Sequence, residues 1–308
     1  MTMLIITDIT KYEKAPCVAT IGSFDGVHLG HLAMLGELRT AASQNGLPLM
    51  VITFATHPRM LFDKEYAPFL LTPSCEKVRL LEAAGVDICV LLNFNRDIAS
   101  MSAAAFMKEF LVERLGVQLL AVGYDHHFGK PSAGEGLEQY IEYGKEFGVD
   151  VFGTQQFIIE GETVSSSAVR RALSCGDVAL TARLLGRNYS LQGTVVHGAG
   201  IGRVLGFPTA NISLEDVGQI LPLDGVYETD VTVDGKTFKG VMNIGVKPTV
   251  SGKERTLEVH IIGFEGDIYE KDITVQFVRR LRGEQSFENV NALRFQIEVD
   301  VARVKRGI

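Results

Sequence analysis

Continuous apolar runs alternate with helix-like stretches from residue 18 to about residue 185. The predicted strands are residues 17–22, 47–54, 86–94 and 117–123, and the predicted helices are residues 31–46, 74–85, 102–116 and 136–148. Strands that are apolar on both faces are typical of parallel sheets covered by helices on both sides. This region is therefore predicted to be a doubly wound α/β domain, whose ligand binds beyond the carboxyl ends of the strands.

The pattern changes beyond about residue 187, where shorter segments are rich in Val, Thr, Phe and Tyr. The predicted strands are residues 191–198, 225–233, 236–245, 255–263 and 271–281. Asp234-Gly235 is expected to close a tight hairpin, and residues 265–270 are expected to join another pair of strands. Apolar residues recur every three or four positions in residues 287–305, which predicts an amphipathic helix. We expect two domains, residues 1–186 and an antiparallel barrel with a terminal helix at residues 187–308.

Charge and hydropathy exclude several classes of protein. The net charge of -7 argues against a nucleic-acid partner, because such binding needs a basic face. No stretch approaches the roughly 18 apolar residues of a membrane span, and the first residues lack the basic region of a signal peptide. The four cysteines lack metal-ligand spacing. We expect a cytoplasmic protein that binds small molecules and neither nucleic acid nor membrane, and no feature specifies its oligomeric state.

Two histidines three residues apart, His28 and His31, lie in the segment GSFDGVHLGH between a predicted strand and a predicted helix. If the turn around Gly30 is helical, both imidazoles lie on one face beside the free amides of a helix N-terminus, which favours anions. They would donate hydrogen bonds to phosphate and stabilise charge that develops during transfer. The alternative is a histidine that only caps the helix or lies on the surface.

The same segment contains two glycines and an aspartate. Gly22 and Gly26 would let the backbone approach a phosphate closely. For Asp25 three roles stay open: it could orient a histidine, contact a metal ion or cap the helix.

A serine-rich turn, VSSSAVRR, precedes another predicted helix. Hydroxyls of Ser165 and Ser166 at the helix start, with the guanidinium of Arg170 one turn later, would form a clamp for a triphosphate. The alternative is an ordinary serine cap with a solvated arginine.

A glycine-rich stretch at residues 195–212 is the densest motif of the second half. Amides near Gly200 and Gly202 could cover phosphates. Thr209 and Asn211 are neutral oxygen donors suited to a Mg²⁺ ion that takes its other ligands from water and nucleotide. A β-turn that uses both side chains for local backbone bonds is the alternative.

Glu258 alternates with apolar neighbours on a predicted strand. If Leu257 and Val259 point the other way, Glu258 and His260 share a face. A carboxylate on the inner wall of a small barrel is costly unless it is paired or used, so Glu258 is a candidate base for activating a hydroxyl. A solvated, outward-facing glutamate is the alternative.

Taken in order, the motifs resemble those of the bacterial bifunctional riboflavin kinase/FMN adenylyltransferase (FAD synthetase) family over nearly the whole chain. HLGH is similar to the HxGH signature of nucleotidyltransferases. The matching segments are GSFDGVHLGH, TFATHPR, VGYDHHFG, VSSSAVR, GRVLGFPTANI, GVYET, NIGVKPTV, LEVHI and LRGEQSF. The resemblance implies an N-terminal Rossmann-like nucleotidyltransferase domain and a C-terminal riboflavin kinase barrel.

The resemblance also implies a function. The barrel would phosphorylate riboflavin to FMN, and the first domain would adenylylate FMN to FAD with release of pyrophosphate. ATP would be the co-substrate, ADP a product and Mg²⁺ the metal. One alternative is a single-function nucleotidyltransferase with a regulatory flavin-binding barrel, and another is a flavin carrier without activity.

Roles for individual residues follow from the same resemblance. The implied catalytic residues are Glu258 as the base, with His28 and His31 in adenylyl transfer. The implied nucleotide-binding residues are Gly22, Phe24, His28, His31, Ser165, Ser166, Arg170, Gly200, Gly202, Thr209 and Asn211. The implied flavin-binding residues are His57, Asp125, Arg282, Glu284 and Phe287, and the implied metal ligands are Thr209 and Asn211. The chain departs from the family pattern at His126 and His127, where an aromatic and a basic residue are usual, and at Ser167, where threonine is usual.

Overall fold

A computed structural model describes residues 2–54, 70–123, 136–198, 200–214, 218–249 and 252–307. The contacts divide the chain into two compact units, Met1–Ser166 and Ser167–Ile308. Two helices, α6 (Ser166–Ser174) and α7 (Val178–Leu185), separate this division from the predicted boundary after residue 186. That boundary stays a prediction. Among the described residues, no helix is both long and apolar enough to cross a membrane.

The first unit contains a six-stranded sheet with the order β1-β4-β3-β2-β5-β6, and every pair in it is parallel. Its strands are β1 (Leu4–Ile6), β2 (Cys17–Ile21), β3 (Leu49–Phe54), β4 (Ile88–Leu92), β5 (Val117–Val122) and β6 (Asp150–Gly153). Its helices are η1 (Ile9–Lys11), α1 (Leu29–Asn45), α2 (Ser74–Ala83), α3 (Arg96–Ser100), α4 (Ala103–Ala105), the π-helix η3 (Phe106–Leu115) and α5 (Leu137–Phe147). A small hairpin, β7 (Ile158–Ile159) with β8 (Glu162–Thr163), completes the unit.

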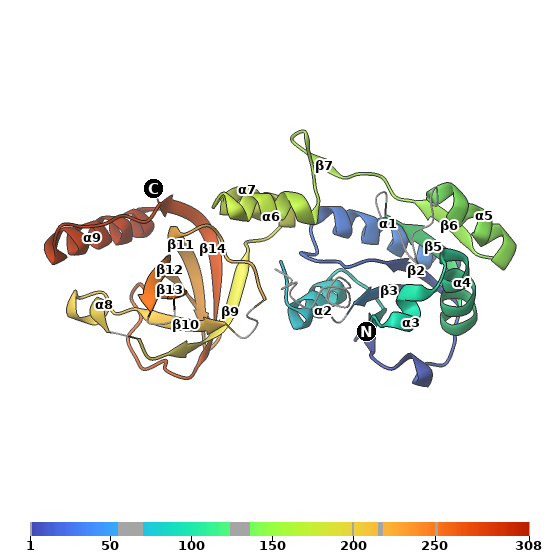
Figure 1. Ribbon diagram of the computed structural model, residues 1–308, viewed down its shortest axis with the longest axis horizontal. Helices are drawn as coiled ribbons and strands as arrows, with labels where there is room; N and C mark the ends of the chain where they lie inside the picture. Colours follow the sequence, from blue (N-terminus) through green and yellow to red (C-terminus); the bar gives the residue numbers. More distant parts are fainter. Residues whose placement is uncertain are drawn as a thin grey trace. The chain divides into compact units, whose positions relative to one another are not determined.

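Both faces of this sheet are buried. On β2, Cys17 and Ala19 point to a cluster that includes Phe106 of η3, whereas Val18 points to a cluster that includes Leu35 of α1. Helices therefore cover the sheet on both sides, which Figure 1 also shows. The strands are apolar along their whole length because both of their faces are buried. The prediction of a doubly wound domain is confirmed.

The second unit contains a closed barrel with the strand order β10-β13-β12-β11-β14-β9. The strands are β9 (Ser190–Val196), β10 (Ala210–Leu214), β11 (Gly225–Val233), β12 (Lys236–Thr249), β13 (Gly252–Ile261) and β14 (Asp272–Arg282), all paired antiparallel. The short helix α8 (Ile201–Val204) precedes β10, and helix α9 (Val290–Arg306) ends the fold (Figure 1). The predicted barrel with a terminal helix is confirmed.

One face of the barrel strands forms its interior. Met242 lies opposite both Tyr227 and Val259 in the strand register, and all three are fully buried. The alternate residues, including Val226 and Val241, point outward and pack against α9. The barrel therefore has an outer wall that is partly covered, and this wall carries the second site described below.

Two predicted connections had different outcomes. Asp234 and Gly235 both have positive φ, of 49° and 76°, and join Val233 to Lys236 as a two-residue hairpin. The expectation that residues 265–270 join paired strands is wrong, because they connect β13 to β14, which are not neighbours in the barrel.

Candidate active sites

His28 and His31 lie together at the start of α1. His28 is the N-cap residue, and its Nδ1 accepts a hydrogen bond from the backbone amide of His31 at 3.2 Å. The two rings stack with their centroids 3.6 Å apart and an interplanar angle of 14°. Because Nδ1 accepts, a neutral His28 ring carries its proton on Nε2 and can donate from there. The pair thus stands at a helix N-terminus, where anions are favoured.

The loop that carries these histidines follows β2 at a particular point of the sheet. From β2 the chain proceeds to β3 and β4 on one side, and it then returns to place β5 and β6 on the other side. The carboxyl end of β2 is therefore the point at which the strand order reverses. Ligands of open α/β sheets bind in the crevice at this point.

Unusual backbone conformations shape this loop. Phe24 and Val27 have positive φ angles of 48° and 38°, a conformation that costs about 1–3 kcal/mol for residues other than glycine. The ring of Phe24 lies 4.8 Å from that of His31. At Gly22 a Cβ would come within 3.3 Å of the Phe24 ring, so the glycine leaves space for this aromatic contact. The loop is held in a defined shape around the histidines.

His31 is kept neutral by its surroundings. Burial lowers its pKa well below the ordinary value of 6.5, and the charges of His28 and Lys77 act in the same direction. Its Nδ1 is buried and has no hydrogen-bond partner within the described ranges. A ligand that supplies a partner would remove the cost of leaving this nitrogen unpaired.

Of the three roles left open for Asp25, one is excluded: His28 caps the helix, so Asp25 does not. The other two roles, orienting a histidine and contacting a metal ion, stay predictions. Asp25 Oδ1 accepts hydrogen bonds from the backbone amides of Leu71 at 3.0 Å and Thr72 at 3.1 Å. The buried carboxylate therefore anchors the segment that leads into α2 to the histidine loop.

The serine turn lies against the same loop. Ser165 directly precedes α6, and the hydroxyl of Ser166 donates to the backbone carbonyl of Asp25 at 2.8 Å. A Cβ at Gly30 would lie 3.1 Å from the backbone oxygen of Val164, so the glycine of HLGH permits close packing here. The structure thus brings together the serine turn and the histidine loop, the two motifs predicted to bind phosphate in the first unit.

For the other residues predicted for this site, the structure shows either a position alone or nothing. Arg170 is half-buried on α6, one turn after Ser166. His57 and Asp125 lie outside the described residues, as do His126 and His127. The predicted contact of Arg170 with nucleotide and those of His57 and Asp125 with flavin stay predictions.

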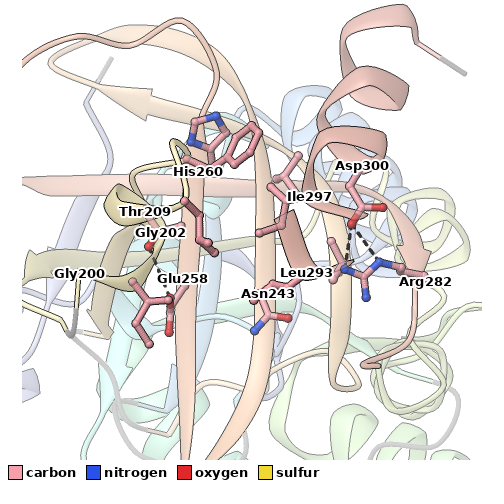
Figure 2. Close-up of a pocket in the computed structure, with 15 residues that line it drawn as sticks. Gly200, Gly202, Thr209, Asn243, Glu258, His260, Arg282, Leu293, Ile297 and Asp300 are labelled. Atoms are coloured by element: carbon pink, nitrogen blue, oxygen red, sulfur yellow. Dashed lines mark hydrogen bonds and ion pairs between the residues drawn. The ribbon is translucent and has the colours of Figure 1, made fainter. Parts of the chain in front are cut away.

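A cavity of about 230 Å³ lies on the barrel, bounded by the segment from Gly200 to Thr209, by strands β11 to β13, and by α9. Five predicted site residues line it: Gly200, Gly202, Thr209, Glu258 and Arg282. Figure 2 shows Thr209, Glu258 and the two glycines on one side of the cavity, and Ile297 and Asp300 of α9 with Arg282 on the other. Apolar walls with a few convergent polar groups are typical of small-molecule sites.

Glu258 faces this cavity from the outer wall of the barrel. Leu257 and Val259 beside it are buried in the interior. The expectation of an inner-wall carboxylate is therefore wrong, because α9 and the α8 segment, and not the barrel, enclose Glu258. The Thr209 hydroxyl donates to Glu258 Oε2 at 3.4 Å, and Glu258 lies opposite Asn243 in the strand register. A half-buried carboxylate with a fixed orientation suits a general base.

The donors around Thr209 fit a magnesium ion. Asn211 lies opposite Glu258 in the register of β10 and β13, although it is not among the residues that line the cavity. A Cβ at Gly198 would lie 2.1 Å from Asn211 Nδ2, and one at Gly202 would lie 3.0 Å from Thr209 Oγ1. Glycine at both positions lets the loop close over these side chains. A hydroxyl, an amide and a carboxylate on one wall are the oxygen ligands that Mg²⁺ prefers.

Arg282 is held in place by the terminal helix. Its Nε and Nη2 lie 2.9 Å and 2.8 Å from Oδ2 of Asp300, whose side chain is 1% exposed. The second oxygen of Asp300 accepts from Gln296 Nε2 at 2.9 Å. The guanidinium therefore reaches the cavity in a fixed orientation (Figure 2).

The other two residues predicted to bind flavin lie beside the cavity and do not line it. The Phe287 ring centroid is 5.8 Å from the Arg282 guanidinium carbon, at the distance of a cation–π contact. Glu284 is exposed, and its Oε1 lies where a Cβ on Gly245 would come within 2.1 Å. Their roles toward flavin stay predictions.

Asp300 and Asn243 are cavity residues that the sequence reasoning missed. Asp300 lies between Ile297 and Val301 on the apolar face of α9, so a charged residue in that periodic pattern was an available signal. Asn243 opens the family-matching segment NIGVKPTV, which was an available signal, but its proximity to Glu258 depends on the register of β12 and β13.

The fold and the two sites define a nucleotide-dependent transferase built from two units. A family model for FAD synthetase matches residues 10–168, and one for riboflavin kinase matches residues 185–308. The chain belongs to the bifunctional riboflavin kinase/FMN adenylyltransferase family, as the sequence motifs predicted.

Relatives with that name match along most of the chain. The protein from Pseudomonas fluorescens is 43% identical, covering 95% of this chain and 93% of its own length. The protein from Escherichia coli K12 is 41% identical, covering 97% and 96%. A crystal structure described as a macrolide-efflux protein from Streptococcus pneumoniae has a TM-score of 0.90 at 28% identity and covers 99% of both chains. The folds of both units are therefore found within one solved chain.

Proposed function

We propose that this chain phosphorylates riboflavin to FMN with ATP in residues 187–308, and adenylylates FMN to FAD with a second ATP in residues 1–186. The observation that carries the proposal is the presence, in one chain, of two separate sites with the required groups: the stacked histidines at a helix N-terminus, and the Thr209–Glu258 pair beside an apolar cavity. Family matches to each part support it.

In the kinase step, the riboflavin 5′-hydroxyl oxygen attacks the γ-phosphorus of ATP and ADP leaves. Glu258 accepts the hydroxyl proton, and the hydrogen bond from Thr209 keeps its carboxylate oriented. Arg282, fixed by Asp300, orients the flavin. Mg²⁺, held by Thr209 and Asn211 with water and phosphate oxygens, would neutralise part of the phosphate charge.

In the adenylyl-transfer step, a phosphate oxygen of FMN attacks the α-phosphorus of ATP. The bond from that phosphorus to the bridging oxygen breaks, and pyrophosphate leaves. His28 and His31 donate hydrogen bonds to the charge that develops, while Ser165, Ser166 and Arg170 hold the triphosphate. No covalent enzyme intermediate is needed, because positioning and charge stabilisation suffice.

The flavins, ATP and ADP are thus the proposed ligands. The sequence-based expectations of a cytoplasmic location and of no nucleic-acid or membrane partner stay predictions.

Incubation with riboflavin, ATP and Mg²⁺, followed by chromatographic separation of riboflavin, FMN and FAD, tests the proposal. FMN should accumulate first and FAD second, and FMN supplied alone should yield FAD with pyrophosphate. A chain that converts added FMN to FAD but forms no FMN from riboflavin would favour the single-function alternative. Flavin binding without turnover would favour a carrier.

A further inference from the structure

Lys77, on α2, is a buried cation beside the first site that has no role in the proposed reaction. The residue is 7% exposed. Its Nζ donates to the backbone carbonyl of Phe54 at 2.9 Å and to that of Ser23 at 3.3 Å. Lysine is rarely buried to this extent unless its charge is used or paired.

The two carbonyls connect Lys77 to the ligand edge of the sheet. Ser23 lies near the start of the loop that leads from β2 to His28, and Phe54 is the last residue of the neighbouring strand β3. The Thr53 hydroxyl donates to the same Ser23 carbonyl at 3.1 Å. Lys77 therefore ties the start of the histidine loop to the carboxyl end of β3, beside the crevice in which the nucleotide is expected.

Among the described residues, no ion pair neutralises the charge of Lys77. Within the described ranges, the partners of Nζ are these two carbonyl oxygens, and the Asp25 carboxylate acts on it through space. Burial lowers the pKa of Lys77, because the charged form loses its hydration. The positive charge of Lys77 also lowers the pKa of His31, so its electrostatic effect reaches the histidine pair. An anion in the crevice would lower the cost of this buried cation.

We propose that Lys77 is a positioning residue for adenylyl transfer, which holds the loop of His28 and His31 against the sheet edge and favours nucleotide phosphate there by its charge. The inference rests on the proposed function of the first unit. Lys77 acts through the loop and the field at the site, and no contact with substrate is required.

Three variants test this role in the full chain. Lys77→Met keeps the length of the side chain but removes its charge and hydrogen bonds, whereas Lys77→Arg keeps the charge. Lys108→Met, at an exposed lysine on η3 of the same unit, is the matched control. FAD formation from FMN gives kcat and KM for ATP, and riboflavin phosphorylation in the same sample reports on the integrity of the chain.

We expect Lys77→Met to lower kcat/KM for FAD formation on the order of 100-fold, because misplacing a reacting group by about 1 Å has an effect of that size. Riboflavin phosphorylation should stay within about twofold of wild type, because its site lies on the barrel. Lys77→Arg should recover most of the loss, and Lys108→Met should match the wild type.

The pH profile separates positioning from mere structural support. Without the nearby positive charge, His31 is easier to protonate, so the acid limb of kcat/KM for FAD formation should move to higher pH in Lys77→Met. A structural defect would lower activity at every pH without moving this limb.

Three results would overturn the inference. The first is unchanged FAD formation in Lys77→Met, and the second is a loss in that variant of FAD formation, riboflavin phosphorylation and the circular dichroism signal together. The third is an acid limb that does not move in Lys77→Met while Lys77→Arg recovers no FAD formation. Wild-type chain that makes no FAD from FMN and ATP would instead reject the proposed function of the first unit.

Discussion

The two sites are built in opposite ways. In the first unit, His28 and His31 belong to one turn of one helix, and the sheet contributes the position at which that helix begins. In the second unit, Thr209, Glu258 and Asp300 come from a loop, a strand and the terminal helix. The histidine pair of the first site is therefore a local structure placed by the fold, whereas the second site exists only when the barrel and α9 are assembled.

This difference has consequences for electrostatics. The first site brings together imidazoles, helix amides and the buried Lys77, which favour an anion. The second site presents the Glu258 carboxylate beside an apolar hollow, which favours an uncharged ring system and the removal of a proton. Because each site has its own chemistry, single substitutions should separate the two reactions.

The largest difference between the effects on the two reactions is expected for Glu258→Gln. The amide keeps the shape of the side chain but cannot accept the riboflavin hydroxyl proton, so FMN formation should fall on the order of 1000-fold. FAD formation from added FMN should be unchanged. Chromatography of both reactions on one preparation measures the two rates. Equal loss of both activities would contradict a separate base on the barrel.

The opposite result, loss of FAD formation with riboflavin phosphorylation intact, is expected for His28→Ala. FAD formation from FMN should fall roughly 100-fold to 1000-fold, because a hydrogen-bond donor to the developing charge is lost. Riboflavin phosphorylation should persist.

His28→Asn is the matched variant, because asparagine can still cap α1 but has no imidazole. If His28→Asn restored full FAD formation, His28 would act only as the helix cap. If His28→Ala removed the kinase step and spared FAD formation, the assignment of reactions to the two units would be wrong.

The two units also differ in how much of each could be predicted from the sequence. The period of the apolar residues located β2 and α1 closely, and the HLGH motif identified the first site because its residues are adjacent in the chain. The short strands β1 and β6 were missed, since three or four residues give little periodic signal. The π-helical turns of η3 lie within residues 102–116, predicted simply as a helix.

In the second unit, long-range order limited the predictions. β10 was hidden because it begins at Ala210, inside the segment interpreted as a turn. Alternation correctly grouped Glu258 with His260, and both line the cavity. It could not tell the inner from the outer wall, because apolar residues also cover part of the outside, where α9 packs. Asp300 is near Arg282 only through that packing.

Asp300→Asn tests whether α9 is part of the second site. The variant removes the charge that orients Arg282, so KM for riboflavin should rise about 10-fold, with a loss of roughly 3 kcal/mol in stability from breaking a buried ion pair. FAD formation from FMN should keep its KM. Steady-state kinetics and thermal unfolding measure both effects.

Glu298→Gln is the control, because Glu298 lies on the same helix in an exposed pair with Arg294. An unchanged KM for riboflavin in Asp300→Asn would mean that Arg282 does not orient the flavin.

The smallest expected effect concerns the pH dependence of stability in the first unit. His31 has a lowered pKa in the folded chain, so below the unfolded-state value of about 6.5 the unfolded chain binds a proton that the folded chain does not. Stability contributed by neutral His31 is thus present above that pH and falls by up to about 1.4 kcal/mol per pH unit below it. His31→Gln should flatten this slope in calorimetric unfolding, whereas His197→Gln, at an exposed histidine, should leave it unchanged. An equal flattening in both variants would show that the surroundings of His31 are not its cause.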